Sequence, residues 1–118
     1  MQRVKVREMR KRRIFTHQNV DLDAVASVWA VRAFYEGFDD AEINFVPANW
    51  GGEDIDPPFD RRMDLILDVE ANGLGVKGVL GPKGRLYSCF SFVIKNADIK
   101  DQERVALSWL VRFVDAQD

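Results

Sequence analysis

Three side chains of the kind that bind metals lie close together near the N-terminus of this 118-residue chain, namely His17, Asp21 and Asp23. They follow an apolar strand end, Ile14-Phe15, and a strongly apolar helical pattern begins immediately after them. An imidazole together with carboxylates is a ligand set that suits Mn²⁺ or a similar divalent ion. A strand-to-helix turn is also where an α/β sheet places its ligand site, beyond the carboxyl ends of the strands. The segment therefore predicts a divalent-metal site at a sheet edge.

A second part of this site is predicted some tens of residues further on. The run 63–69 is apolar apart from Asp64 and Asp68, which is typical of a buried parallel strand. Asp68 closes the strand, so its carboxylate is expected at the same edge as His17. The alternative is that Asp21 and Asp23 only cap the next helix and that Asp68 only forms a turn. A helix needs one acidic cap, so this alternative leaves His17 and one aspartate unexplained.

Residues 17–27 resemble motif I of the DHH phosphoesterase superfamily, which reads roughly His-x-Asn-Pro-Asp-x-Asp-Ala-x-x-Ser. The positions that match are His17, Asn19, Asp21, Asp23, Ala24 and Ser27, and Val20 stands where proline is usual. Asp68 resembles the lone aspartate of the family's second motif. The resemblance implies a DHH N-terminal-domain-like fold and hydrolysis of a phosphodiester or phosphoanhydride by metal-activated water.

The same resemblance implies a specific distribution of metal ligands. His17, Asp21 and Asp68 would hold one ion, while Asp23 and a bridging Asp68 would hold a second. The family's Asp-His-His motif is absent: the expected place, near residues 79–82, has neither acid nor histidine, and His17 is the only histidine. The family's C-terminal substrate-binding domain is also missing. The chain is therefore expected to be a truncated and degenerate phosphoesterase domain or, alternatively, a non-catalytic binding or oligomerisation module that keeps the fold.

The order of hydrophobic patterns predicts one α/β domain spanning residues 1–118. Strands are expected at 12–17, 42–50 and 63–69, and helices at 21–36 and 101–116, with a loop at 70–86 that includes a short strand at 76–80. Residues 87–94 suit a helix or a strand. This order is typical of a three-layer domain with a mainly parallel sheet. Trp29, Trp50, Trp109 and the single cysteine, Cys89, are all predicted to pack inside.

Composition and charge limit the remaining possibilities. No apolar run is long enough to span a bilayer, and a lone cysteine agrees with a reducing compartment, so a cytoplasmic protein without membrane contact is expected. Residues 1–13 form a strongly basic extension or edge strand. Basic clusters attract nucleic-acid phosphates, but no aromatic residues accompany this one to stack on bases. We therefore favour charges that discourage edge pairing, and keep a short nucleic acid or a phosphorylated small molecule as candidate ligands.

A glycine-rich loop lies between the two halves of the chain. Residues 73–78 spell Gly-x-Gly-x-x-Gly, but two further glycines and Pro82 follow, so the helix that a dinucleotide site requires is not expected. The loop carries Lys77, Lys83 and Arg85, which we predict to bind a substrate phosphate near the metal edge. A solvated hairpin is the alternative.

Overall fold

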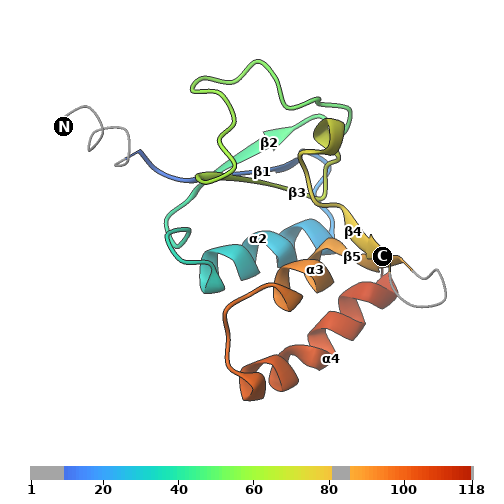
Figure 1. The fold of residues 1–118 in the computed structure, drawn as a ribbon. Coiled ribbons are helices and arrows are strands. Elements are labelled where there is room, and N and C mark those ends of the chain that lie inside the picture. The colour runs from blue at the N-terminus through green and yellow to red at the C-terminus, as the bar shows by residue number, and fades with distance from the viewer. Residues whose placement is uncertain (1–9, 81–85, 118) are drawn as a thin grey trace.

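A computed structural model describes residues 10–80 and 86–117 as a small α/β domain (Figure 1). Its elements, in chain order, are β1 (Arg13–His17), α2 (Leu22–Phe34), β2 (Glu42–Val46), β3 (Asp64–Leu67), the 3₁₀ helix η1 (Ala71–Gly73), β4 (Gly78–Leu80), β5 (Leu86–Ser88), α3 (Cys89–Lys95) and α4 (Asp101–Gln117). The predicted α/β class is thereby confirmed. The ambiguous segment 87–94 is mostly helix, and the strand predicted at 42–50 ends at Val46.

The central sheet has three parallel strands in the order β2-β1-β3. In the β1–β3 register, Arg13 lies opposite Asp64 and Phe15 lies opposite Ile66. Because all three strands run in the same direction, their carboxyl ends meet at one edge of the sheet (Figure 1). β4 and β5 form a separate antiparallel pair. The predicted mainly parallel sheet is therefore confirmed.

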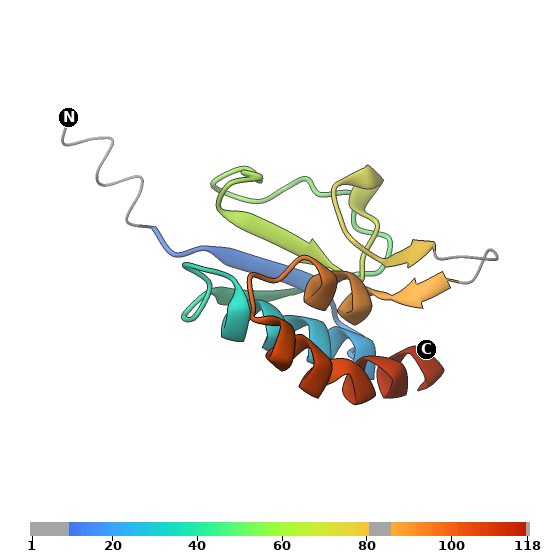
Figure 2. The same ribbon diagram turned by 60° about the horizontal axis from the view of Figure 1, so that its bottom comes forward.

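One face of the sheet is covered by helices. Side chains alternate between the two faces of a strand, and Ile14 and Leu67 point into a core shared with Val31 of α2, Phe90 of α3 and Val114 of α4. The last three are 0% exposed. α2 and α3 lie against the sheet, and α4 packs on both of them as the outermost layer (Figures 1 and 2).

The opposite face of the sheet is covered by irregular chain. Phe15 and Ile66 point to this side and pack with Val46, Val69 and Ala71. The indole of Trp50 stacks on Phe15 with ring centroids 5.1 Å apart, which confirms that this tryptophan is a packing residue. Apart from η1, the layer on this face comes from the loop between β2 and β3 (Figure 2).

Two predicted core residues are on the surface instead. Trp29 is 46% exposed and Trp109 is 62% exposed, so the prediction that both are buried is wrong. In α2 the inward side is lined mainly by small residues such as Ala24 and Ala30. An apolar pattern all round a helix shows that several of its sides are apolar, but it does not show that the same chain covers them.

The basic N-terminus is only partly within the described residues. Residues 1–9 lie outside them, so the strand proposed for that part is not assessed, whereas Arg13 belongs to β1 and is buried. Among the described helices, none combines the length and apolar character that a membrane crossing requires.

Candidate metal centre

His17 is the last residue of β1, on the same face as Arg13 and Phe15. The turn that follows it is fixed to the neighbouring strand, because the backbone N–H of Gln18 donates to the carbonyl oxygen of Val46 at 2.9 Å. The imidazole is half-buried. It therefore stands at the carboxyl edge of the central strand, where the sequence predicted it.

Asp21 is the N-cap of α2. Its backbone is extended, and its Oδ1 accepts a hydrogen bond from the N–H of Ala24 at 2.9 Å. The capping interpretation is thus confirmed for this residue. The cap uses one of the two carboxylate oxygens, and the side chain is exposed. Capping and metal binding are therefore compatible at Asp21.

Asp68 follows β3 directly and is held by the chain that returns after η1. Its N–H donates to the carbonyl oxygen of Val76 at 2.6 Å, and the N–H of Val76 donates to Ile66 at 2.9 Å. This return needs a glycine at position 75, since a Cβ there would lie 1.7 Å from the carbonyl oxygen of Val69. Asp68 itself has a φ of 62°, a left-handed conformation that aspartate and asparagine tolerate better than most residues. The turn fixes the carboxylate at the sheet edge.

The structure brings His17, Asp21 and Asp68 together. One ligand atom from each lies within 4.8 Å of the other two. Nε2 of His17 is 3.0 Å from Oδ2 of Asp68. Within residues 10–80 and 86–117, this is the only group of three or more such side chains that is close enough to hold one ion. Two carboxylates and one imidazole form a donor set that fits a divalent ion such as Mn²⁺.

Asp23 is the exception among the predicted ligands, because its carboxylate lies elsewhere. The residue is 2% exposed, and its two oxygens accept from the backbone N–H groups of Cys89 at 3.0 Å and Phe90 at 2.8 Å. The hydroxyl of Ser27 donates to the same carboxylate at 3.3 Å. Asp23 therefore holds the first turn of α3, a helix with no acidic residue in its own first turn. No local sequence signal indicated this, since the partners are more than sixty residues apart.

Cys89 lies behind the metal edge and is fully buried. The pKa of its thiol is raised to about 12, chiefly by burial and also by the nearby carboxylates of Asp23 and Asp68, while hydrogen bonds with the Ser27 side chain and the Asp68 backbone act in the opposite direction. The thiol is therefore protonated at neutral pH and is not a nucleophile. The prediction that Cys89 is a packing residue is confirmed.

The predicted phosphate-binding loop is only partly described. Lys77 is exposed and follows Val76, whose backbone holds Asp68, so it lies at the rim of the metal edge. Lys83 and Arg85 lie outside the described residues. The glycine pattern at 73–78 leads into β4, and not into a helix.

The comparison with known proteins gives no relative. No known family, no curated protein and no solved structure matches the chain. The motif I pattern and the geometry of the sheet edge are therefore the observations on which a function has to be argued.

Proposed function

We propose that this chain is a degenerate DHH-like phosphoesterase domain that binds one divalent metal ion, Mn²⁺ or a similar ion, and through it a phosphorylated ligand. The observation that carries the proposal is the convergence of His17, Asp21 and Asp68 within 4.8 Å at the carboxyl edge of a parallel sheet. His17 is the last residue of β1, Asp68 directly follows the neighbouring β3, and Asp21 is the N-cap of α2. Three ligands from separate elements form a rigid site.

The ligand count favours one ion over two. Asp23 would be the main protein ligand of a second ion, but both of its oxygens already accept hydrogen bonds from the start of α3. Release of Asp23 would leave the buried N–H groups of Cys89 and Phe90 without that partner, at a cost of about 1–3 kcal/mol each. We therefore assign Asp23 a structural role.

A bound divalent ion supplies Lewis acidity towards phosphate oxygens and towards water. The chain's own contribution is to orient the three ligands and to present Lys77 at the rim of the site, where its ammonium can attract a phosphate. Asp21 is exposed and His17 is half-buried, so a ligand can approach from solvent. Hydrolysis of a phosphodiester or phosphoanhydride is expected to be slow, because one ion cannot clamp both the attacking and the leaving oxygen.

A second candidate is a binding module without catalysis, in which the metal only recruits a phosphorylated ligand. The engagement of Asp23 with α3 is the observation that favours it. A measurement of hydrolysis separates the two candidates. A degenerate phosphoesterase should hydrolyse bis-p-nitrophenyl phosphate slowly in the presence of Mn²⁺, and a pure binding module should not hydrolyse it.

The proposal is tested by titrating Mn²⁺ into the metal-free protein by calorimetry. We expect one tight site per chain, strong weakening in Asp68→Asn, and an affinity within about threefold of wild type in Asp23→Asn if that variant folds. Glu70→Gln is the matched control, since Glu70 is an exposed carboxylate close in sequence to Asp68 but outside the cluster. Two tight sites with Asp23-dependent turnover would overturn the one-ion assignment, and unchanged affinity in Asp68→Asn would overturn the site.

A further inference from the structure

The exposed apolar side chains of this domain are concentrated on two helices. Within the described residues, six of the large apolar side chains that are exposed belong to the outward sides of α2 and α4; these are Leu22, Val25, Trp29, Val105, Trp109 and Phe113. We call this set the α2/α4 face. The two helices lie alongside each other (Figures 1 and 2). Phe34, the last residue of α2, has its ring centroid 5.5 Å from that of Trp29 and packs against the core on the helix side of the sheet.

α4 is apolar on both of its sides. Its inward side carries the buried Val114 and the core-packed Leu107 and Leu110. Its outward side carries Val105, Trp109 and Phe113, which are 71%, 62% and 50% exposed. Residues four apart lie on one stripe of a helix, and a surface helix normally has polar residues there. The outward stripe is therefore suited to a contact with another protein surface.

The amount of exposed aromatic surface fits a stable interface. Aromatic side chains present about 150–250 Å² each, so the exposed fractions of Trp29, Trp109 and Phe113 leave roughly 240–400 Å² open. That is about a third to a half of the ~800 Å² that each partner contributes to a standard interface. Trp29 also borders a shallow hollow of about 460 Å³ beside α2, which is lined by Val25, Val28, Trp29, Arg32, Ala33 and Asp39.

Two residues of opposite charge, Asp101 and Arg112, lie near the two ends of the α4 stripe and indicate which partner fits it. Asp101 stands at its start and Arg112 near its end, 11 residues apart, or roughly 16 Å along the helix. The other charged residues of α4 are engaged within the chain: Glu103 with the N–H of Lys100, Arg104 with the carbonyl groups of Ile94 at the end of α3 and of Ala97 after it, and Asp115 with Ser88. For Asp101 and Arg112 no side-chain hydrogen bond or ion pair is found among the described residues.

We infer that a second copy of this chain covers the α2/α4 face, with the two α4 helices packed antiparallel about a two-fold axis that meets the outward stripe midway between Val105 and Trp109. This arrangement sets Trp109 against Val105 of the second copy and places Asp101 of each copy beside Arg112 of the other. A parallel packing would instead bring like charges together. A two-fold contact is also the commonest symmetry of soluble oligomers.

The interface is tested by analytical ultracentrifugation of the full chain over a wide range of concentrations. Wild type should be a dimer, and Trp109→Glu should weaken association at least about 100-fold, because it places a charge at the centre of the contact. Phe45→Glu is the matched control and should leave the dimer intact, because Phe45 is 58% exposed on β2, an edge strand of the sheet, and is not part of the α2/α4 face. Circular dichroism verifies that both variants are folded.

A charge exchange tests the antiparallel orientation. Asp101→Arg and Arg112→Asp should each weaken the dimer about tenfold, and the double variant should recover most of the wild-type affinity, because it restores both pairs with opposite polarity. A monomeric wild type, or a dimer that Phe45→Glu breaks and Trp109→Glu does not, would overturn the proposal. Failure of the double exchange to recover affinity would overturn the antiparallel orientation.

Discussion

The same face of β1 and β3 carries a polar pair at each end and an apolar pair between them. At the amino end, Arg13 of β1 lies opposite Asp64 of β3, and at the carboxyl end His17 lies beside Asp68, four residues further along each chain segment. The two ends differ in how their carboxylates are balanced. This difference separates a structural ion pair from a candidate binding site.

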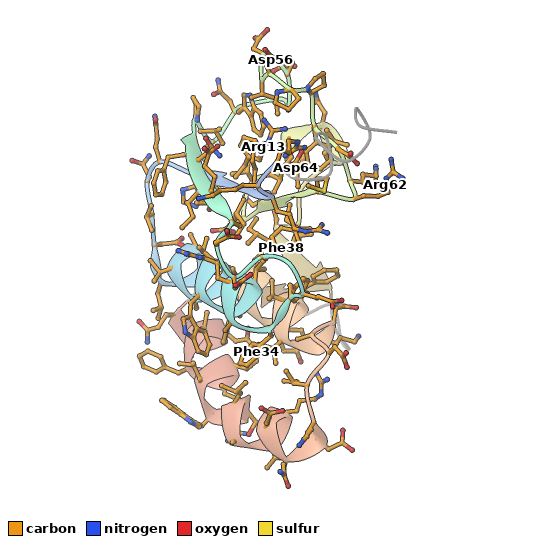
Figure 3. The ribbon with its side chains drawn as sticks, turned by 90° about the vertical axis from the view of Figure 1, so that its left-hand side faces the viewer. Arg13, Phe34, Phe38, Asp56, Arg62 and Asp64 are labelled. Atoms are coloured by element: carbon orange, nitrogen blue, oxygen red, sulfur yellow. The ribbon has the colours of Figure 1, made fainter. Side chains whose placement is uncertain are left out.

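At the amino end the negative charge is balanced within the chain. Asp64 is 1% exposed and receives hydrogen bonds from the guanidinium groups of Arg13 and Arg10 and from the N–H of Asp60 (Figure 3). Arg13 also donates to the carbonyl oxygen of Pro57 at 2.8 Å. Burial acts to raise the pKa of Asp64, but these hydrogen bonds outweigh it and the pKa is lowered. Two guanidinium groups, those of Arg10 and Arg13, therefore donate to the single carboxylate of Asp64.

At the carboxyl end, the part of the chain that the structure describes has a different composition. Two carboxylates, Asp21 and Asp68, gather with one imidazole, and the cluster opens to solvent at Asp21. Carboxylates that gather in this way favour an additional cation. Position along the strand is therefore not sufficient to identify a site, because at both ends an aspartate on or directly after β3 lies beside a nitrogen-bearing side chain of β1. Within the described residues, Asp64 accepts hydrogen bonds from two guanidinium groups, whereas Asp68 lies in a cluster with a second carboxylate and an imidazole.

The largest effect is expected from Asp64→Asn. The change leaves the buried guanidinium of Arg13 without its carboxylate, and we expect a loss of about 3–5 kcal/mol in the free energy of unfolding. Asp68→Asn in metal-free protein should lose about 1 kcal/mol or less, since asparagine accepts the left-handed backbone and can keep the contact with His17. Denaturant titration measures both variants. Equal losses of unfolding free energy in Asp64→Asn and Asp68→Asn would contradict the proposed difference between the amino and carboxyl ends of the strands.

Mn²⁺ should bind only at the carboxyl end of β1 and β3, and its binding should stabilise the folded protein. A ligand at about 100 times its Kd adds roughly 2.7 kcal/mol to the free energy of unfolding, so the melting temperature of wild type should rise. His17→Ala should abolish the rise, whereas Glu70→Gln should keep it. A His17→Ala protein with the full shift would place the ion elsewhere.

Acid should destabilise the protein through the amino end. The folded-state pKa of Asp64 lies below its ordinary value of 3.8, so this group contributes stability above that pH and loses it as the pH falls through the lowered pKa. Stability measured by urea titration should therefore drop below about pH 4 in wild type. Asp64→Asn, starting from a lower stability, should show a shallower decline, and a parallel decline in both proteins would assign the acid sensitivity to other carboxylates.

The smallest effect is expected at the rim. Lys77→Ala should weaken the binding of inorganic phosphate to the Mn²⁺-loaded protein about two- to fivefold, in keeping with an exposed charge contact. Arg62 is the control, because it is an exposed base near the amino end of β3 (Figure 3). Arg62→Ala should leave phosphate affinity unchanged. Equal losses in the two variants would indicate general attraction of the anion by surface charge.

The contact of Asp23 with α3 is a tertiary feature that the sequence did not indicate. In the chain Asp21 and Asp23 are nearly equivalent, two acids at the start of one helical pattern. Their side chains leave the helix start in different directions, so Asp21 stays at the sheet edge while Asp23 turns inward to α3. The partners of Asp23 are backbone groups, which carry no residue-type signal.

The sequence by itself determined the parallel sheet, the helix after His17 and the identity of the three side chains at its edge. These follow from local causes, namely the period of apolar residues, one cap and the ends of apolar runs. Only the tertiary structure decided that Asp23 holds α3, that Arg13 and Asp64 form a buried pair, and that Trp29 and Trp109 face outward. Each of these depends on what a side chain meets across the fold, and hydrophobic burial is non-directional, so an apolar pattern does not specify the surface that will cover it.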